Sequence, residues 1–145
     1  FPLAPVTDIA VDPLVSSIVY ATRGAFGPSN LYRSNSGGTH WQPFSTGLPN
    51  VPANAVAVDP LDGLKVFVGT DVGVFLGIGQ FGFSPMMDGM PLGAVITDLE
   101  VDDDPHILTA GTYGRGAWRY DLSPPPTFAD GFESGDESRW SSVVE

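Results

Sequence analysis

The sequence predicts an all-β fold made of repeated four-stranded antiparallel units. Eighteen glycines and 14 prolines interrupt the 145-residue chain, and no stretch free of both exceeds eleven residues, from Ala94 to Asp104. Globular helices usually need roughly 8–20 uninterrupted residues, so helices have little room. The second observation is an internal repeat, in which short apolar runs return at regular intervals along the chain.

The repeat is clearest at a segment that ends in Val-Asp. Residues 7–13 (TDIAVDP) return as residues 54–60 (NAVAVDP) and as residues 97–103 (TDLEVDD), so the Val-Asp pairs lie 47 and then 43 residues apart. Intervals of this size are typical of propeller blades, each of which is a four-stranded sheet. The sequence therefore predicts a partial β-propeller over residues 1–122, with two full repeats and one incomplete repeat. The expected repeats are, approximately, residues 1–49, 50–91 and 92–122.

Each repeat is expected to contain the same strands in the same order. The first strand alternates in polarity and ends at an Asp-containing turn, and the second is more continuously apolar, as expected between two neighbouring blades. A third strand follows, but a fourth is predicted only at residues 41–44 and 83–86. Because the third repeat stops after its third strand, at Tyr120, its edge would be unpaired. We expect another polypeptide to supply the missing strand.

Residues 34–41 (SNSGGTHW) resemble the Asp-box of the sialidase-type (BNR) propellers, whose pattern is S-x-D-x-G-x-T-W. In that family the box is the turn between the third and fourth strands, which implies structural roles for Ser34, Ser36, Gly38 and Trp41. Ser36 replaces the Asp of the pattern, and we expect its hydroxyl to accept backbone hydrogen bonds more weakly than a carboxylate would. Residues 111–118 (GTYGRGAW) are similar to the closing segment of bacterial BNR propellers, including those related to xyloglucanase-type glycosidases and sortilin-like receptors.

The composition changes after Leu122. Residues 123–127 begin with Ser-Pro-Pro-Pro and predict a stiff linker, which is followed by an acidic-aromatic tail at residues 128–145. Residues 130–141 are similar to a D-G-F-E-S-G-D-x-S-x-W-S ending of many exported gammaproteobacterial proteins, and this resemblance implies a secreted or extracellular location. We expect the tail to dock by Phe132 and Trp140 on a separate apolar surface.

Two groups of residues are candidates for binding. An arginine with two aromatic residues on a Gly-rich turn can hold a sugar or a carboxylate, and these residues are Tyr113, Arg115 and Trp118. The alternative is a structural turn in which Arg115 pairs with an acidic neighbour. The tail offers carboxylates for Ca²⁺, which takes six to eight oxygen ligands. They belong to Asp130, Glu133, Asp136 and Glu137. A solvated acidic tail is the alternative there, and a simple turn is the alternative for the acidic run at residues 102–104.

Charge and composition argue against several classes of function. Six Lys and Arg residues against 17 Asp and Glu residues give a net charge of −11, which is unsuited to binding nucleic acid. No apolar run approaches the roughly 18 residues that span a bilayer, and the absence of cysteine excludes thiolate chemistry. The sequence singles out no carboxylate pair of a glycosidase, and neither His40 nor His106 has a recognisable Ser or Asp partner. We therefore expect no catalysis by this chain alone.

Three interpretations of the function follow. The first is a non-catalytic propeller module of an exported protein, used for binding or assembly. The second is the C-terminal blades of a secreted glycoside hydrolase, sialidase- or xyloglucanase-like, whose catalytic residues lie outside this chain. The third is a structural subunit of an extracellular assembly. An open arc of blades exposes apolar faces, so the expected partners are further blades of a parent protein or copies of the chain itself. The expected ligand is a carbohydrate or a protein.

Overall fold

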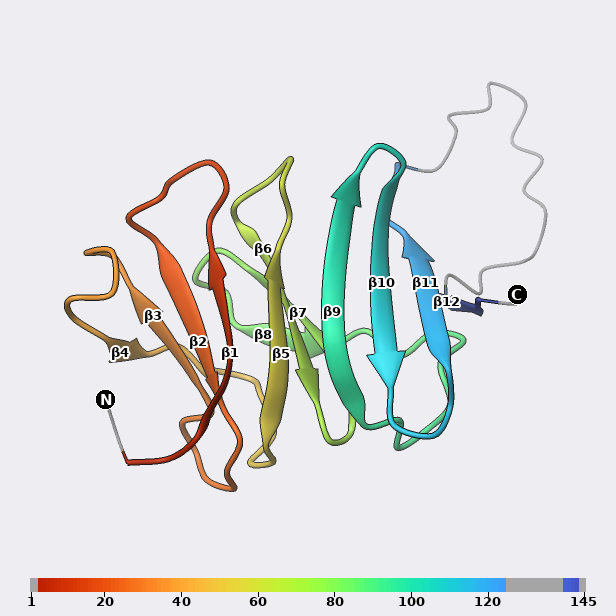
Figure 1. Cartoon of the computed structure of the whole chain (residues 1–145), viewed down its shortest axis with the longest axis horizontal. Helices are drawn as coiled ribbons and strands as arrows, with labels where there is room; N and C mark the ends of the chain where they lie inside the picture. Colours follow the sequence, from red (N-terminus) through yellow and green to blue (C-terminus); the bar gives the residue numbers. More distant parts are fainter. Residues whose placement is uncertain (1–2, 125–139, 144–145) are drawn as a thin grey trace.

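A computed structural model describes residues 3–124 and 140–143 of the chain. These residues form three four-stranded antiparallel sheets, which we call blades 1, 2 and 3. The blades lie side by side along the long axis of the molecule, from the red N-terminal sheet to the blue C-terminal one (Figure 1). Nothing in the described ranges forms a helix that could cross a membrane. The prediction of an all-β fold built from propeller-type blades is confirmed.

Within each blade the strands pair in chain order. Blade 1 contains β1 (Val6–Val11), β2 (Val19–Arg23), β3 (Leu31–Ser34) and β4 (Gln42–Pro43). Blade 2 contains β5 (Ala53–Val58), β6 (Lys65–Thr70), β7 (Gly73–Ile78) and β8 (Phe83–Pro85). Blade 3 contains β9 (Ile96–Asp103), β10 (His106–Thr112), β11 (Ala117–Asp121) and β12 (Trp140–Ser142). The first strands, β1, β5 and β9, are neighbours across the blades (Figure 1).

The blades pack face to face through two apolar cores. Between blades 1 and 2, Tyr20 and Leu31 pack with Val56. Between blades 2 and 3, Phe67 packs with Leu108. Strand β6 lies in the middle blade, and all of its residues after Lys65 are buried. The continuously apolar second strand is thus explained by contacts on both of its faces.

The fourth strand of blade 3 comes from the tail. Strand β12 pairs antiparallel with β11, and Trp140 lies opposite Tyr120. The expectation that another polypeptide supplies this strand is therefore wrong. Prolines after Ser123 disfavour an immediate reversal, but 17 residues separate Leu122 from Trp140, which leaves ample chain for an antiparallel return.

Trp140 has the position in blade 3 that Phe83 has in blade 2. Phe83 lies opposite Gly77 on the third strand, just as Trp140 lies opposite Tyr120. On their other side, Gly77 and Tyr120 both pair with a residue near the start of the second strand of their blade. The indole is almost fully buried in the core between blades 2 and 3. Trp140 therefore does not dock on a separate surface, as the sequence suggested, but completes blade 3. Phe132 lies outside the described residues.

Candidate functional site

In blades 1 and 2, the Asp residue that follows the first strand contacts the next blade. In blade 1, the Asp12 carboxylate accepts hydrogen bonds from Leu14 N at 2.8 Å and Val15 N at 3.2 Å in its own turn. It also lies against Gly63 of blade 2, where an added Cβ would come within 2.7 Å of Asp12 Oδ2. A side chain at this position of blade 2 would therefore collide with the carboxylate. The contact requires a glycine or a different arrangement of the turn.

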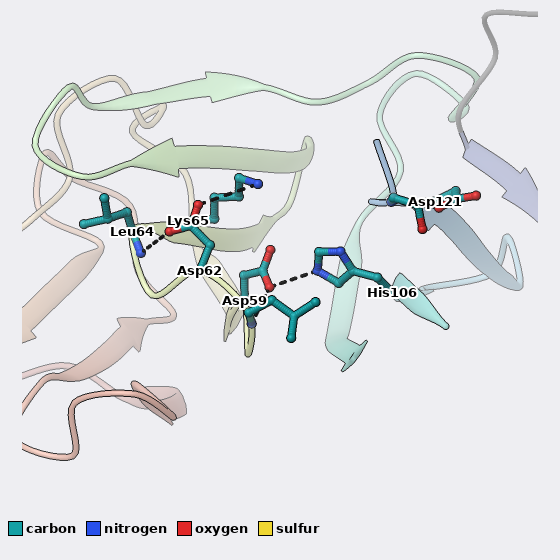
Figure 2. A network of polar contacts seen from close by, with 8 residues as sticks. Asp59, Asp62, Leu64, Lys65, His106 and Asp121 are labelled. Carbon is teal, nitrogen blue, oxygen red and sulfur yellow. Dashed lines mark hydrogen bonds and ion pairs between the residues drawn. The ribbon is translucent and has the colours of Figure 1, made fainter. Parts of the chain in front are cut away.

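Asp59 makes the corresponding contact between blades 2 and 3, and Figure 2 shows its bond to His106. Asp59 Oδ1 accepts hydrogen bonds from Leu61 N and from His106 Nε2, both at 2.9 Å. Gly63 follows Asp59 by four residues, and His106 follows Asp102 by four. At both junctions the Asp of one blade therefore meets the fourth residue after the Asp of the next blade, once a glycine and once a histidine, although the turn of blade 3 is one residue shorter.

The prediction that His106 has no Asp partner is wrong. The two residues lie 47 positions apart and in different repeats, so neither local spacing nor a motif connects them. A signal was present in the repeat itself, because both junctions use the fourth residue after the Val-Asp pair. The described part of the chain contains one further ion pair, Asp62 with Lys65 at 3.7 Å, also drawn in Figure 2.

A second repeated contact joins the starts of the first strands. Thr7 Oγ1 donates to Ala53 O at 2.6 Å, and Asn54 Nδ2 donates to Ile96 O at 3.0 Å. Thr7 and Asn54 occupy one position of the repeat, and their acceptors occupy another. Asp8 Oδ2 of blade 1 accepts a further hydrogen bond, at 2.9 Å, from the main-chain N–H of residue 56 in blade 2. The junctions are therefore held by polar side chains that bind the backbone of the next first strand.

A groove of about 400 Å³ opens between the turns of blades 1 and 2. Its rim is apolar and includes the exposed side chains of Leu14, Leu61 and Leu64. Its polar lining includes Arg33 and Tyr20. An apolar rim around a few polar groups is the usual composition of a small-molecule site.

Arg33 lies beside two neighbouring aromatic rings at this groove, whose centres are 5.8 Å apart. Its guanidinium carbon lies 5.3 Å from the ring centre of Phe44 and 5.9 Å from that of Tyr20. Arg33 Nε is buried without a hydrogen-bond partner among the described residues. Burial raises the pKa of Tyr20; the Arg33 charge lowers it, and the Asp12 charge raises it further. Arg33 is thus the positive charge among the residues that line the groove.

The Ser34–Trp41 turn is held by side-chain hydrogen bonds to its own backbone. Ser34 Oγ accepts from Gly38 N at 2.9 Å, and Ser36 Oγ accepts from His40 N at 2.9 Å. The Trp41 indole donates to Gly38 O at 2.8 Å. The expected role of Ser36 as an acceptor in the turn is present. Its assignment to the Asp-box stays a prediction.

The Gly-rich turn after β10 separates the three candidate ligand-binding side chains. Tyr113 is 79% exposed and Arg115 is also exposed, whereas Trp118 is half-buried against the core between blades 2 and 3. The Trp118 indole donates to Arg115 O at 3.0 Å. Within residues 3–124 and 140–143, the Arg115 guanidinium takes part in no ion pair. Ligand binding by these residues stays a prediction.

The four candidate Ca²⁺ ligands of the tail, Asp130, Glu133, Asp136 and Glu137, lie outside the described residues. Their binding of Ca²⁺ stays a prediction. Over the part of the chain that the structure describes, no three acidic or histidine side chains gather as metal ligands. This statement includes the acidic run at residues 102–104.

Comparison with known proteins supports the fold. No protein-family model matches the chain, and no curated protein is similar to it in sequence. Among solved structures, it is similar to the GH74 enzyme of Niastella koreensis, with 21% identity and a TM-score of 0.60 over 77% of this chain and 19% of that one. The GH74 xyloglucanase of Xanthomonas campestris shares 19% identity, with a TM-score of 0.60 over 85% of this chain and 23% of that one.

An ancestral GH74 enzyme is also similar, with 13% identity and a TM-score of 0.53 over 97% of this chain and 28% of that one. The chain thus spans only 19% to 28% of the length of these three proteins. At such identities the likeness shows the fold, which is an array of propeller-type blades.

Proposed function

We propose that this chain is a non-catalytic β-propeller module of an exported protein, used for binding or assembly through an open blade face. The observation that carries the proposal is an unequal burial of equivalent residues. In blade 1, Ile9 is 58% exposed and Val11 is 52% exposed. Their counterparts in blade 2, Val56 and Val58, are 3% and 8% exposed because they pack against blade 1. Exposed apolar surface of this kind marks an interaction site.

The exported character of the module is supported by its tail. Residues 130–141 resemble an ending of exported gammaproteobacterial proteins. Tryptophan in this segment also has a structural use, because Trp140 completes blade 3. A detergent-free fractionation of a bacterium expressing the gene would test export, with the chain expected outside the cytoplasmic fraction.

The open face can be tested with an apolar dye whose fluorescence rises on exposed hydrophobic surface. The double variant Ile9→Ser, Val11→Ser should bind at least about twofold less dye, while its stability stays within about 0.5 kcal/mol of the parent. The matched control is Val56→Ser, Val58→Ser, which should lose several kcal/mol because these side chains are buried. Unchanged dye binding in the first variant would contradict an open face.

A second candidate is a segment of a glycoside hydrolase, since the three structural neighbours carry the GH74 name. This candidate places the catalytic residues outside the chain. Incubation of the purified chain with xyloglucan should release no reducing sugar under either proposal, and release above a mock preparation would refute both. Affinity electrophoresis in gels containing xyloglucan separates them when the Ile9→Ser, Val11→Ser variant is included: retardation that this variant loses supports binding through the open face, and retardation that it keeps favours the hydrolase segment.

A further inference from the structure

We infer that the open face of blade 1 receives one further blade of the same type, which precedes β1 in the polypeptide. The inference rests on the proposed function and names the partner for the same face. Two junctions inside the chain show what such a partner must present. Two of the contacts that blades 2 and 3 receive from the blade before them have an open counterpart on blade 1, whereas Ile9 N, the counterpart of Val56 N, already donates to Asp8 Oδ1.

The first unfilled contact is a backbone acceptor. The carbonyls of Ala53 and Ile96 each accept a hydrogen bond from a side chain of the preceding blade. The equivalent carbonyl of blade 1 belongs to Val6, a residue that is 46% exposed. A preceding blade would bind it through a threonine or asparagine placed like Thr7 or Asn54.

The second unfilled contact lies in the turn between β1 and β2. Gly63 and His106, each the fourth residue after the Asp of its own blade, each meet an Asp from the preceding blade. The blade 1 residue at this position is Ser16, and it is exposed. Its hydroxyl can donate to a carboxylate, so a preceding blade with a Val-Asp pair would find a partner there.

The segment ahead of β1 makes the same backbone hydrogen bond as the two segments that lead from one blade into the next. Gly24 N donates to Pro5 O at 3.0 Å, as Asp71 N donates to Pro52 O at 3.2 Å and Tyr113 N donates to residue 95 O at 2.9 Å. The second and third of these bonds hold the segments that lead from one blade into the next. The first shows that the same entry path exists ahead of blade 1.

A second copy of the chain fits this face poorly. In a head-to-tail pair, the outer face of blade 3 would cover Ile9 and Val11, and this face carries the exposed charged residues Asp98, Glu100 and Arg119. In blade 2, the positions of Asp98 and Glu100 hold Ala55 and Ala57, which are buried against blade 3. Placing two carboxylates against aliphatic side chains is unfavourable. The partner blade must instead present small apolar side chains there.

A fused blade tests the inference on the chain itself. A copy of residues 48–95, which contains blade 2 and its exit, is joined directly ahead of Val6, so that Val6 takes the place of Ile96. We expect the melting temperature to rise by at least about 5 °C and dye binding to fall. Amide exchange of β1 should slow at least about tenfold. The matched control carries Ala55→Glu and Ala57→Glu in the copied blade only, and it should lose these gains.

The possible outcomes distinguish the inference from the proposed function. If the unmodified chain binds dye through Ile9 and Val11 but the fusion gains no more stability than its Glu control, the open face is real and a preceding blade is not its partner. If the parent chain binds no dye there, the proposed function fails first. Light scattering of the unmodified 145-residue chain should give a monomer of 15.3 kDa. A larger species that the double variant Ile9→Ser, Val11→Ser returns to monomer would assign the face to a second copy and overturn the inference.

Discussion

Replacing Trp140 by alanine would test whether the tail strand is an integral part of blade 3. The side chain is 2% exposed and lies in the core between blades 2 and 3. Its indole donates to Met86 O at 2.8 Å, and its ring meets that of Tyr120 edge-on with centroids 5.2 Å apart. Alanine removes the packing, the hydrogen bond and the ring contact together.

The magnitude follows from the area that the indole removes from water. A buried aromatic side chain hides about 150–250 Å², worth about 4–6 kcal/mol at about 25 cal/mol per Å². This figure is an upper bound because the unfolded chain already hides part of that area. Truncation of buried tryptophans typically costs about 3–5 kcal/mol, and we expect a loss in this range. Small domains have only about 5–15 kcal/mol in total, so the change would be large.

Urea unfolding followed by circular dichroism is the suitable assay, since the fluorescence signal would lose one of three tryptophans. Trp41→Ala is the matched control, because Trp41 has the equivalent place in blade 1 but is partly exposed. Its loss should be clearly smaller. Trp140→Phe should cost about 1–2 kcal/mol, mainly through the lost indole hydrogen bond. A loss below about 1 kcal/mol for Trp140→Ala would refute the docking of the tail in blade 3.

Three further substitutions test the contacts of the blades. Ser36→Asp should be neutral or mildly stabilising, because a carboxylate accepts the bond from His40 N more strongly than a hydroxyl does; a loss above about 1 kcal/mol in thermal unfolding would contradict it. His106→Ala should cost about 1–3 kcal/mol and His106→Gln less, since glutamine keeps a donor for Asp59; equal costs would exclude a contribution from this bond. The raised pKa of Tyr20 means that the folded state binds its proton more tightly, so this stabilisation is complete below the unfolded value of about 10 and is lost as the pH rises through the folded value. As the pH rises from about 9 to about 11, the free energy of unfolding of Tyr20→Phe should therefore fall less than that of the unmodified chain in urea titrations. Equal losses would contradict this.

The repeat in the sequence was sufficient to predict the blades. Alternation in the first strand and continuous apolarity in the second arise from contacts that every blade shares, so each repeat carries them independently. The fourth strand of blade 3 is not evident from the sequence, because the prolines after Ser123 disfavour a reversal even though the chain beyond them is long enough for one. The sequence of the strand does carry a local indication, since Trp140-Ser141 repeats the aromatic-serine pair of Phe83-Ser84. The pair becomes visible only once the tail is compared with the fourth strands.

The contacts between blades could not be predicted from local patterns. The sequence predicts a turn at Asp59, and its carboxylate does accept a hydrogen bond in its own turn from Leu61 N. Its second role depends on His106, and nothing in the order of the residues places these two side chains together. Likewise, the position of Thr7 relative to Ala53 follows from the stacking of the blades. Such contacts can be predicted once two junctions are compared, because both use the same repeat positions.

The polar contacts and the apolar faces of the blades vary independently among the three repeats. Thr97 keeps the place that Thr7 and Asn54 use to bind the next blade, although it is exposed. On the same face Glu100 replaces the alanine that blade 2 buries against blade 3. The polar contacts bind main-chain atoms, which any following strand offers, whereas the apolar contacts depend on the neighbour's side chains. The charge at Glu100 therefore rejects an apolar blade without removing the residue that would align one. At the other end Ile9 and Val11 are exposed, so the outer faces of blades 1 and 3 differ in character, and the blade that we infer would fit the face of blade 1 better than that of blade 3.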